Sequence, residues 1–588
     1  MNVERSGAGV PLLRLRPPVI RARVHAMGTL RALGARVPAV AAGLAASIPV
    51  IDSTVKAVRR GWVPAGDDGI IATRGWDVLT THTPLVGQFS EAGFVIHSQS
   101  LHSPGPMLYW LLALPARYGG VTSIPVTIGV LNTLAIVGCV VLARRRGGLP
   151  LMFATALAIA LMCQSLATEV MHDIWNPAAA LFPLLLLMFL CWSLSCGEHR
   201  LLPLTALVAS FVVQTHLAYA APTLVLLVVG VAGLLIRSRV ARTRRAGPRV
   251  WPWALAGLVV LAVCWTAPAI DEIEHTPGNM TLIVRTVGHR EATLGASVGW
   301  RAVERSVGVR PWWLYVPASE WERKYDVRTA SSTARRDTTI ALLGVLLLLV
   351  PIAALARRWD LLAAAAIGLG LSAAIGLQAA SNPSDRLLAG TLGYTMWWGS
   401  ELGLWVWLTL AWAAWLGLAS LLRRARPRLD SRLAGRAGAS AATRRAAIGL
   451  ASLASLGGVV AVGLAVTADA RPDSHGYEYA SIRQMAAAIE RAIPPGRTIA
   501  YRFGHLGRGT QPMETALRFL LVRRGDRPLA DGSRPRLGDY YVEGDRPVQW
   551  VLLLTDSRRA QRGMRLVSRV RFSGPWGAEV LSAWVRRA

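Results

Sequence analysis

The chain has 588 residues, of which 53% are hydrophobic, and its formal net charge at pH 7 is +30. Soluble domains rarely reach its mean hydropathy of +0.39, so a lipid bilayer is the expected solvent. The charge would also suit a nucleic-acid-binding protein. However, the arginines gather in short loops between apolar segments, and no nucleic-acid recognition module accompanies them. Composition therefore favours a membrane protein.

Residues 1–36 are basic and precede an apolar segment near 37–57. A polar loop follows that segment, so we expect a signal anchor and not a cleaved signal peptide.

Mostly apolar segments of roughly 20 residues, long enough to cross a bilayer, recur along the chain. About eleven are expected, and the first and fifth are the weakest. They lie near 37–57, 121–143, 149–167, 178–196, 201–217, 219–236, 252–270, 339–356, 361–380, 394–421 and 447–467.

The arginine clusters predict which loops face the cytoplasm. They all fall on one side under a single alternation of the spans, and by the positive-inside rule that side is the cytoplasm. The clusters are Arg14 to Arg23, Arg144–Arg146, Arg237 to Arg249, Arg357–Arg358 and Arg423 to Arg445. The transmembrane domain, 37–467, is then expected to have outer loops at 58–120 and 271–338.

Part of the first outer loop, "SPGPMLYWLLALPARY", is apolar but too short to cross a bilayer, and prolines bracket it. It is predicted to be a re-entrant segment or an interfacial helix, with Tyr109 and Trp110 at headgroup level.

Residues 468–588 are soluble in character. "YASIRQMAAAIERAI" and "METALRFLLVRR" have helical spacing, whereas "RTIAYRF" and "VQWVLLLT" are typical of strands. The expected fold is a polytopic α-helical membrane protein with a small C-terminal extracytoplasmic α/β domain. No internal repeat is evident, which counts against an inverted-repeat transporter.

The residues between Gly66 and Pro115 carry a family resemblance. "GDDGIIA", "RGWDVL", "PLVGQFS" and "HSPGPMLYWLLALP" together resemble the first outer loop of GT-C membrane glycosyltransferases. The likeness is greatest to bacterial family-39, arabinofuranosyl and mannosyl transferases of actinobacterial type. It implies a GT-C-like fold. It also implies transfer of a sugar from a polyprenyl-phosphate donor to a cell-envelope glycan, lipid or protein outside the membrane.

Asp67 matches the loop acid of that family best. A carboxylate there can take the proton of an acceptor hydroxyl as it attacks the anomeric carbon. Asp68 is the second candidate, as base or as partner to Asp67, because adjacent carboxylates raise one another's pKa. The alternative is that both acids only cap a helix starting at Gly69.

The second outer loop, "TEVMHDIWNP", supplies further polar residues before a span. The resemblance implies a second acidic site here, for which Asp173 is the candidate, with His172 and Asn176 as substrate contacts. A divalent cation (Mg²⁺, Mn²⁺ or Ca²⁺) is possible, with Asp68 and Asp173 as candidate ligands, although they are not a ligand set. Alternatively, Asn176 and Pro177 only start the next helix, with Trp175 as an interface anchor.

Four further places hold candidate residues. His102, which like His97 flanks the proline-containing segment, could contact the acceptor or phosphate, and His216 lies at the outer end of a span. Arg386 is a candidate phosphate clamp, or it pairs with Asp385 or anchors at headgroups. Trp312 and Trp313 could stack on sugars, but a place on the membrane surface is favoured.

Two rival functions remain at this point. A secondary transporter would place ionisable residues at the bilayer midplane, whereas most acids here lie in outer loops. A non-catalytic cell-envelope assembly protein would tolerate loss of Asp67 without loss of sugar transfer. A ligase for a whole lipid-linked polymer would share the topology.

Overall fold

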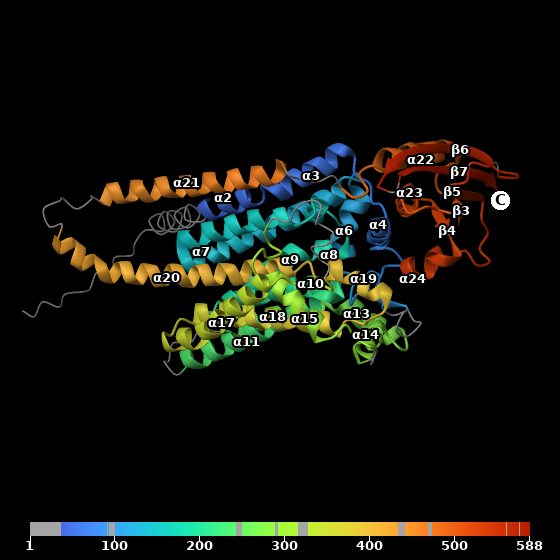
Figure 1. Cartoon of the computed structure of the whole chain (residues 1–588). Coiled ribbons are helices and arrows are strands. Elements are labelled where there is room, and N and C mark those ends of the chain that lie inside the picture. Colours follow the sequence, from blue (N-terminus) through green and yellow to red (C-terminus); the bar gives the residue numbers. More distant parts are fainter. Residues whose placement is uncertain are drawn as a thin grey trace, which may run out of the picture.

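The structure is a computed structural model that describes residues 37–90, 92, 100–242, 250–288, 292–314, 327–432, 441–468, 473–559, 561–575 and 577–588. A long bundle of helices carries a small sheet domain at one end (Figure 1). The predicted basic N-terminus (1–36) and His97 lie outside the described residues.

The helices before the sheet domain have the following bounds: α2 Val37–Ala46, α3 Ile48–Arg60, α4 Asp67–Asp77, α6 Met107–Tyr118, α7 Ser123–Ser165, α8 Asn176–Ala179, α9 Leu181–Ser195, α10 Leu202–Thr215, α11 Ala220–Arg242, α12 Trp251–Cys264, α13 Thr266–Glu274, α14 Asn279–Gly288, α15 Ala296–Val307, α17 Thr333–Leu355, α18 Trp359–Ser381, α19 Arg386–Thr395, α20 Gly399–Arg432 and α21 Ala441–Ala468. Two short strands, β1 (Phe89–Ser90) and β2 (Leu101–His102), pair antiparallel in the first loop.

Within the described residues, seven helices are long and apolar enough to cross a membrane. The number rises to nine when the bent pairs α2–α3 and α12–α13 are each one span. The chain therefore folds as a polytopic α-helical membrane protein, as the sequence predicted. Such helices satisfy their own backbone hydrogen bonds, which hydrocarbon cannot do.

Helix α7 holds two of the expected spans in one hairpin. Gly148 interrupts it with φ 66° and ψ −153°. Asn132, in the first leg, donates to the carbonyl of Met171, which lies just beyond the second leg. A straight helix would hold residues 132 and 165 about 50 Å apart, so the second leg must run back beside the first. This hairpin and the 14-residue α10 account for the difference from the eleven expected segments.

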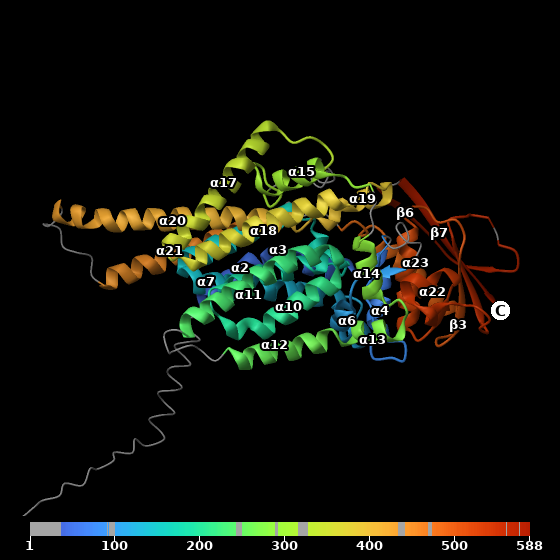
Figure 2. The same cartoon turned by 90° about the horizontal axis from the view of Figure 1, so that it is seen from below.

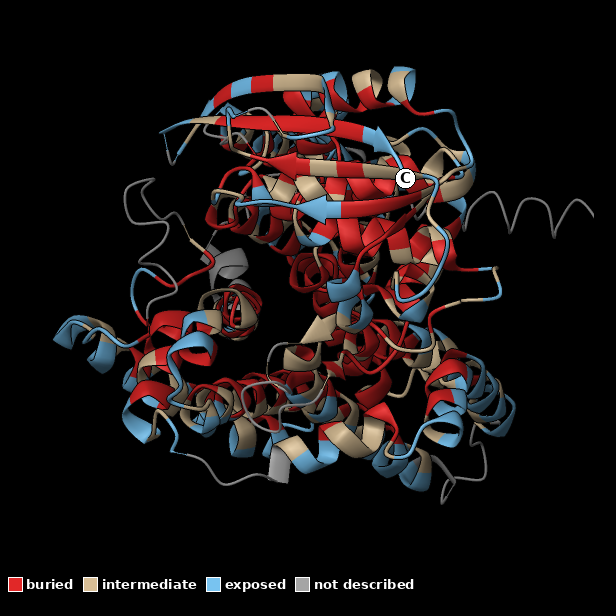
Figure 3. Cartoon of the chain, turned by 90° about the vertical axis from the view of Figure 1, so that its right-hand side faces the viewer, coloured by how far each residue is buried: buried red, intermediate tan, exposed pale blue. Residues whose placement is uncertain are grey.

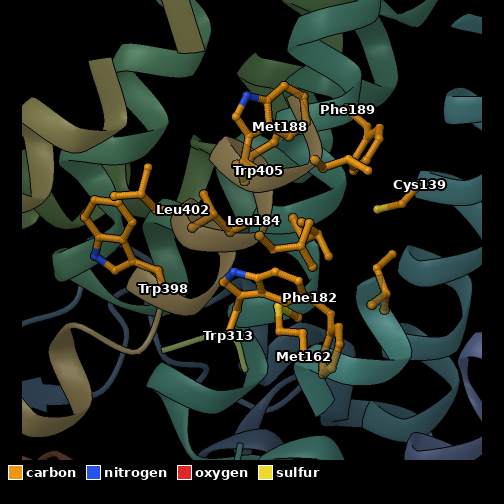
Figure 4. Close-up of a cluster of buried hydrophobic side chains, with 14 of the residues drawn as sticks. Cys139, Met162, Phe182, Leu184, Met188, Phe189, Trp313, Trp398, Leu402 and Trp405 are labelled. Carbon is orange, nitrogen blue, oxygen red and sulfur yellow. The ribbon is translucent and has the colours of Figure 1, made fainter. Parts of the chain in front are cut away.

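Helix α9 lies at the centre of the bundle, whereas α17 and α21 lie at its edge. In α8 and α9 together, 94% of the 18-residue apolar stretch is buried inside the protein, against 17% of the corresponding stretch in α17 and 11% in α21. Phe182, Met188 and Phe189 of α9 pack with Trp405 and Leu402 of α20 (Figure 4). Because the outer helices are equally apolar, their exposed faces suit lipid.

The sheet domain is an α/β unit. Its elements are α22 Tyr479–Ala492, β3 Thr498–Phe503, α23 Gln511–Arg523, β4 Arg527–Leu529, α24 Arg534–Leu537, β5 Trp550–Thr555, β6 Arg565–Gly574 and β7 Gly577–Arg587. The strand order is β4-β3-β5-β7-β6, with β3 parallel to β4 and β5 and the other pairs antiparallel. The two helices and two strands that the sequence predicted here are confirmed as α22, α23, β3 and β5.

The predicted long loop 271–338 instead contains helices α14 and α15 among its described residues. Placing Trp312 and Trp313 on the membrane surface was wrong, since both are buried. They pack against α20 at Gly399 and Gly403, where a Cβ would meet the two indoles.

Two ends of the bundle differ in what they carry. At one end, the sheet domain covers the loop containing α4 and α6 (Figures 1 and 2). Viewed from there, its strands lie across the ends of the helices (Figure 3). We call this the sheet-domain end. At the other, the arginine end, Arg145 and Arg146 of the α7 hairpin pair with Glu198. Arg358 pairs nearby with Asp360.

Candidate functional site

Helix α4 presents two carboxylates in its first turn. It begins at Asp67, after Gly66, whose φ of 62° favours glycine. No side chain caps the helix, so the prediction that Asp67 and Asp68 cap a helix starting at Gly69 is wrong. Both acids instead lie where the helix dipole favours negative charge.

The two adjacent acids have different surroundings. Asp67 is exposed, whereas Asp68 is buried. Burial raises the pKa of Asp68 well above its usual range, and the charge of Asp173 and a hydrogen bond to it raise that pKa further. Asp67 and Glu169 also contribute through their charges. The protonated form of Asp68 is therefore favoured, and its hydroxyl can donate the hydrogen bond to Asp173.

Trp175 connects Asp67 to an aromatic group on the facing helices. Its indole Nε1 donates to Asp67 Oδ2 at 3.2 Å. Its ring lies 4.7 Å from that of Tyr394 and 5.5 Å from that of Trp397. His216 meets Tyr394 edge-on, with ring centroids 6.3 Å apart. The loops that carry Asp67 and Trp175 thus converge near α19.

Tyr394 also lines an open cavity of about 670 Å³ along α19, together with Arg386 and Thr391. The Arg386 side chain is exposed at this cavity. Asp385 uses Oδ1 to accept the backbone N–H groups of Leu387 and Leu388, which caps α19. Arg386 is therefore placed so that an anionic group in the cavity can reach it.

Two candidate residues from the second loop make structural contacts within the protein. His172 is buried, and its Nδ1 lies 2.6 Å from Ser53 Oγ of α3. Asn176 donates to the carbonyl of Thr215 and begins α8, with Pro177 in its first turn. The helix-start interpretation of Asn176 is confirmed, and both side chains fix the loop that carries Asp173.

The segment before α22 enters the same acidic site. The Ser474 amide donates to Glu169 Oε2 at 2.6 Å. Asp473 Oδ2 lies 3.6 Å from His172 Nε2 and accepts from the Tyr479 hydroxyl at 3.4 Å. The pKa of Glu169 is raised by burial and by the charge of Asp173.

Helix α23 fixes the start of α4. The Gly66 amide donates to the Pro512 carbonyl at 3.0 Å, and Thr515 Oγ1 donates back to the Gly66 carbonyl at 2.6 Å. A Cβ on Gly69 would lie 2.5 Å from the backbone carbon of Thr515, so the two helices approach as closely as glycine allows.

His102 has contacts outside this cluster. Its backbone N–H donates to Asn279 Oδ1, and its ring Nε2 lies 2.9 Å from the Pro535 carbonyl of α24. Burial lowers the pKa of His102. Its role as an acceptor or phosphate contact stays a prediction.

Asp68 and Asp173 could bind a metal ion only if further ligand side chains lay beside them. Among the described residues, no group of three or more His, Cys, Asp or Glu side chains is arranged to hold a metal ion. Asp68 and Asp173 hydrogen-bond to each other instead. The donor atoms of the described residues therefore do not fit a metal site.

Sequence reasoning missed the contribution of residues 473–479, "DSHGYEY". The run holds Asp473, His475 and Glu478 immediately after the last apolar segment. That density of titratable groups beside a span was an available signal. The contacts with Glu169 and His172 join positions about 300 residues apart, which no sequence period reveals.

Fold and site together define a multi-pass membrane protein in which two loops and the sheet domain contribute to an acidic site. No protein-family model matches the sequence, and no curated protein matches it significantly. Among solved structures, the chain is similar to ArnT from Cupriavidus metallidurans, crystallised with undecaprenyl phosphate bound. The TM-score is 0.47 at 14% identity, and the match covers 92% of this chain and 97% of that one.

Proposed function

We propose that this protein is a membrane glycosyltransferase of the GT-C type. It transfers a hexose or pentose, with mannose and arabinofuranose as first choices, from a polyprenyl-phosphate donor. The acceptor is a hydroxyl of a cell-envelope glycan, lipid or protein. The sheet-domain end then faces outward from the plasma membrane, and the arginine end faces the cytoplasm.

The observation that carries the proposal is the set of contacts made by Trp175. Through it, the exposed carboxylate of Asp67 is joined to Tyr394, and Tyr394 lines the same cavity as Arg386. In this proposal, Asp67 is the base for the acceptor and Arg386 is the cation for the phosphate, and both lie at one end of the bundle. Sugar transfer from a lipid phosphate needs both groups.

In the proposed mechanism, Asp67 takes the proton of the acceptor hydroxyl. The acceptor oxygen forms a bond to the anomeric carbon, and the bond from that carbon to the phosphate oxygen breaks. Polyprenyl phosphate leaves with the bonding electrons. The carboxylates also stabilise the positive charge that develops on the sugar. Asp67 is favoured over Asp68 as the base because its carboxylate is exposed, whereas Asp68 is buried and its raised pKa favours the protonated form, which cannot accept a proton.

The test is a transfer assay in membranes with a panel of polyprenyl-phosphate sugars. Asp67→Asn should lower kcat by about 10²- to 10⁴-fold, the usual contribution of a general base. The matched control is Asp539→Asn, which alters an exposed pair with Arg534 on the sheet domain and should leave the rate unchanged. Full activity of Asp67→Asn would remove the assignment. Transport of the lipid-linked sugar without transfer would favour the transporter alternative.

A further inference from the structure

The segment before α22 places a histidine, His475, beside the acidic site. Nδ1 of His475 lies 3.5 Å from Glu478 Oε1 on the same short segment. The opposite ring nitrogen, Nε2, faces α4: a Cβ on Gly66 would lie 3.7 Å from it. The side chain of Glu478 is fully buried, whereas that of His475 keeps 36% of its surface exposed. A buried carboxylate therefore orients a half-exposed imidazole toward the residue preceding Asp67.

The charges around this imidazole are mostly negative. Asp67 follows Gly66 on α4, Glu169 and Asp173 come from the second loop, and Glu478 lies beside the ring. Burial lowers the pKa of His475, but the hydrogen bond to Glu478 and its charge, then Glu169 and Asp173, raise it above the usual value overall. A phosphate entering this site would be repelled by the carboxylates unless a cation faced it.

We propose that His475, oriented by Glu478, binds the phosphate of the lipid-linked donor through its Nε2–H, so that the sheet domain completes the transfer site. This inference rests on the proposed glycosyltransferase function and adds a binding residue to it. Glu478 acts as a positioning residue, because it accepts a hydrogen bond from Nδ1–H, which fixes the ring and favours the imidazolium, in which Nε2 also carries a proton.

The chemistry of the leaving group favours a cation at this place. The donor phosphate is a diester with one negative charge. When its bond to the sugar breaks, the phosphate becomes a monoester with a second negative charge. An imidazolium that hydrogen-bonds to it therefore stabilises the departing group more than the bound donor. No proton needs to be transferred for this effect.

The test compares His475→Ala and Glu478→Gln with His505→Gln. His505 is a matched control, because it also lies beside a carboxylate of the sheet domain, 3.7 Å from Asp556, but its side chain is 85% exposed. His475→Ala should raise KM for the donor and lower kcat/KM by roughly 10- to 100-fold, the usual range for a charge-assisted hydrogen bond. The KM for the acceptor should not change.

The pH profile separates phosphate binding from a structural role. Since the pKa of His475 is raised, the wild type should keep its donor affinity up to a higher pH than a free histidine allows. That affinity should be lost as pH rises through the raised pKa. In Glu478→Gln the loss should move to lower pH, and in His475→Ala it should disappear. Variants with wild-type donor KM, or with an altered acceptor KM only, would overturn the inference.

A binding measurement separates this inference from the proposed function. Polyprenyl phosphate without a sugar is titrated against the full chain in nanodiscs of neutral lipid. Weaker binding in His475→Ala supports the phosphate site even if no donor is turned over. If transfer depends on Asp67 while polyprenyl phosphate binds His475→Ala as tightly as wild type, only the present inference fails. Equal thermal unfolding of the variants confirms that they are folded.

Discussion

The two ends of the helix bundle handle charge in opposite ways. At the arginine end, Arg145 and Arg358 form ion pairs with Glu198 and Asp360, and both arginine side chains are at least 40% exposed. At the sheet-domain end, Asp68 and Glu169 are held among other carboxylates, and their pKa values are raised. Exposed ion pairs contribute little to the free energy of folding. Arginines in loops between spans instead help to set the orientation of a membrane protein. Crowded carboxylates cost stability, and such an arrangement is typical of a functional site.

Of the variants that test this difference between the two ends, Gly69→Ala should have the largest effect on transfer and stability. A methyl group there would lie 2.5 Å from the Thr515 backbone, so α4 and α23 must separate. Overpacking of this kind costs about 1–3 kcal/mol, and the misplaced Asp67 should lower transfer by at least tenfold. Gly417→Ala on α20, where a Cβ meets nothing within 4 Å, is the matched control. Similar rates and melting temperatures for both variants would contradict the close contact.

Tyr541→Phe should weaken the attachment of the sheet domain. The Tyr541 hydroxyl donates to buried Asp77 at 2.7 Å, and Asp77 also contacts Arg74 and His82. Loss of one partner of a buried carboxylate costs about 1–3 kcal/mol. Limited proteolysis of the sheet domain measures this loss. Tyr540→Phe is the control, because Tyr540 contacts His82 by ring stacking. Equal protection in both variants would show that the Asp77 bond contributes nothing.

Trp175→Phe tests whether the hydrogen bond from Trp175 to Asp67 supports the reaction. The substitution removes the hydrogen bond to Asp67 but keeps an aromatic ring beside Tyr394. We expect kcat to fall by about tenfold or more, since a hydrogen bond to a charged group contributes about 1.5–3 kcal/mol and about 1.4 kcal/mol corresponds to tenfold in rate. Trp415→Phe, on the exposed face of α20, should have the wild-type kcat. An unchanged kcat in Trp175→Phe would mean that Asp67 needs no such support.

The smallest effect is expected from Asp68→Asn, and it depends on pH. The pKa of Asp68 is raised in the folded protein above its ordinary 3.8. Ionisation of Asp68 therefore destabilises the folded state increasingly as pH rises from 3.8. Asn cannot ionise, so the variant should gain melting temperature relative to wild type as pH rises, and lose this gain in acid. Asp360→Asn at the arginine end is the control. A difference in melting temperature that does not change with pH would contradict the raised pKa of Asp68.

Most spans of the membrane bundle could be predicted from sequence, because each span is a continuous apolar segment and arginines cluster in the loops between spans. The Ser123–Ser165 hairpin was predicted as two spans on this basis. Local periodicity also predicted α22, α23, β3 and β5 of the sheet domain, but not its long strands β6 and β7. The burial of Trp312 was not predicted, because composition alone does not distinguish a lipid-facing indole from one packed on Gly399.

The candidate site was predicted only in part. Asp67, Asp68 and Asp173 were selected because their loops resemble those of GT-C glycosyltransferases, and the structure brings the three acids together. The contributions of Ser474 and His475 depend on how the sheet domain sits on α4, which is tertiary information. The assigned roles of His102, His216 and Arg386 are still predictions.

The acidic site draws on three pieces of chain that are widely separated: 67–68, 169–173 and 473–479. The third piece follows every described span in the chain, so it is synthesised last of the three. A chain that still lacks the segment after α21 therefore has neither His475 nor the Ser474 amide, and its acidic site is incomplete.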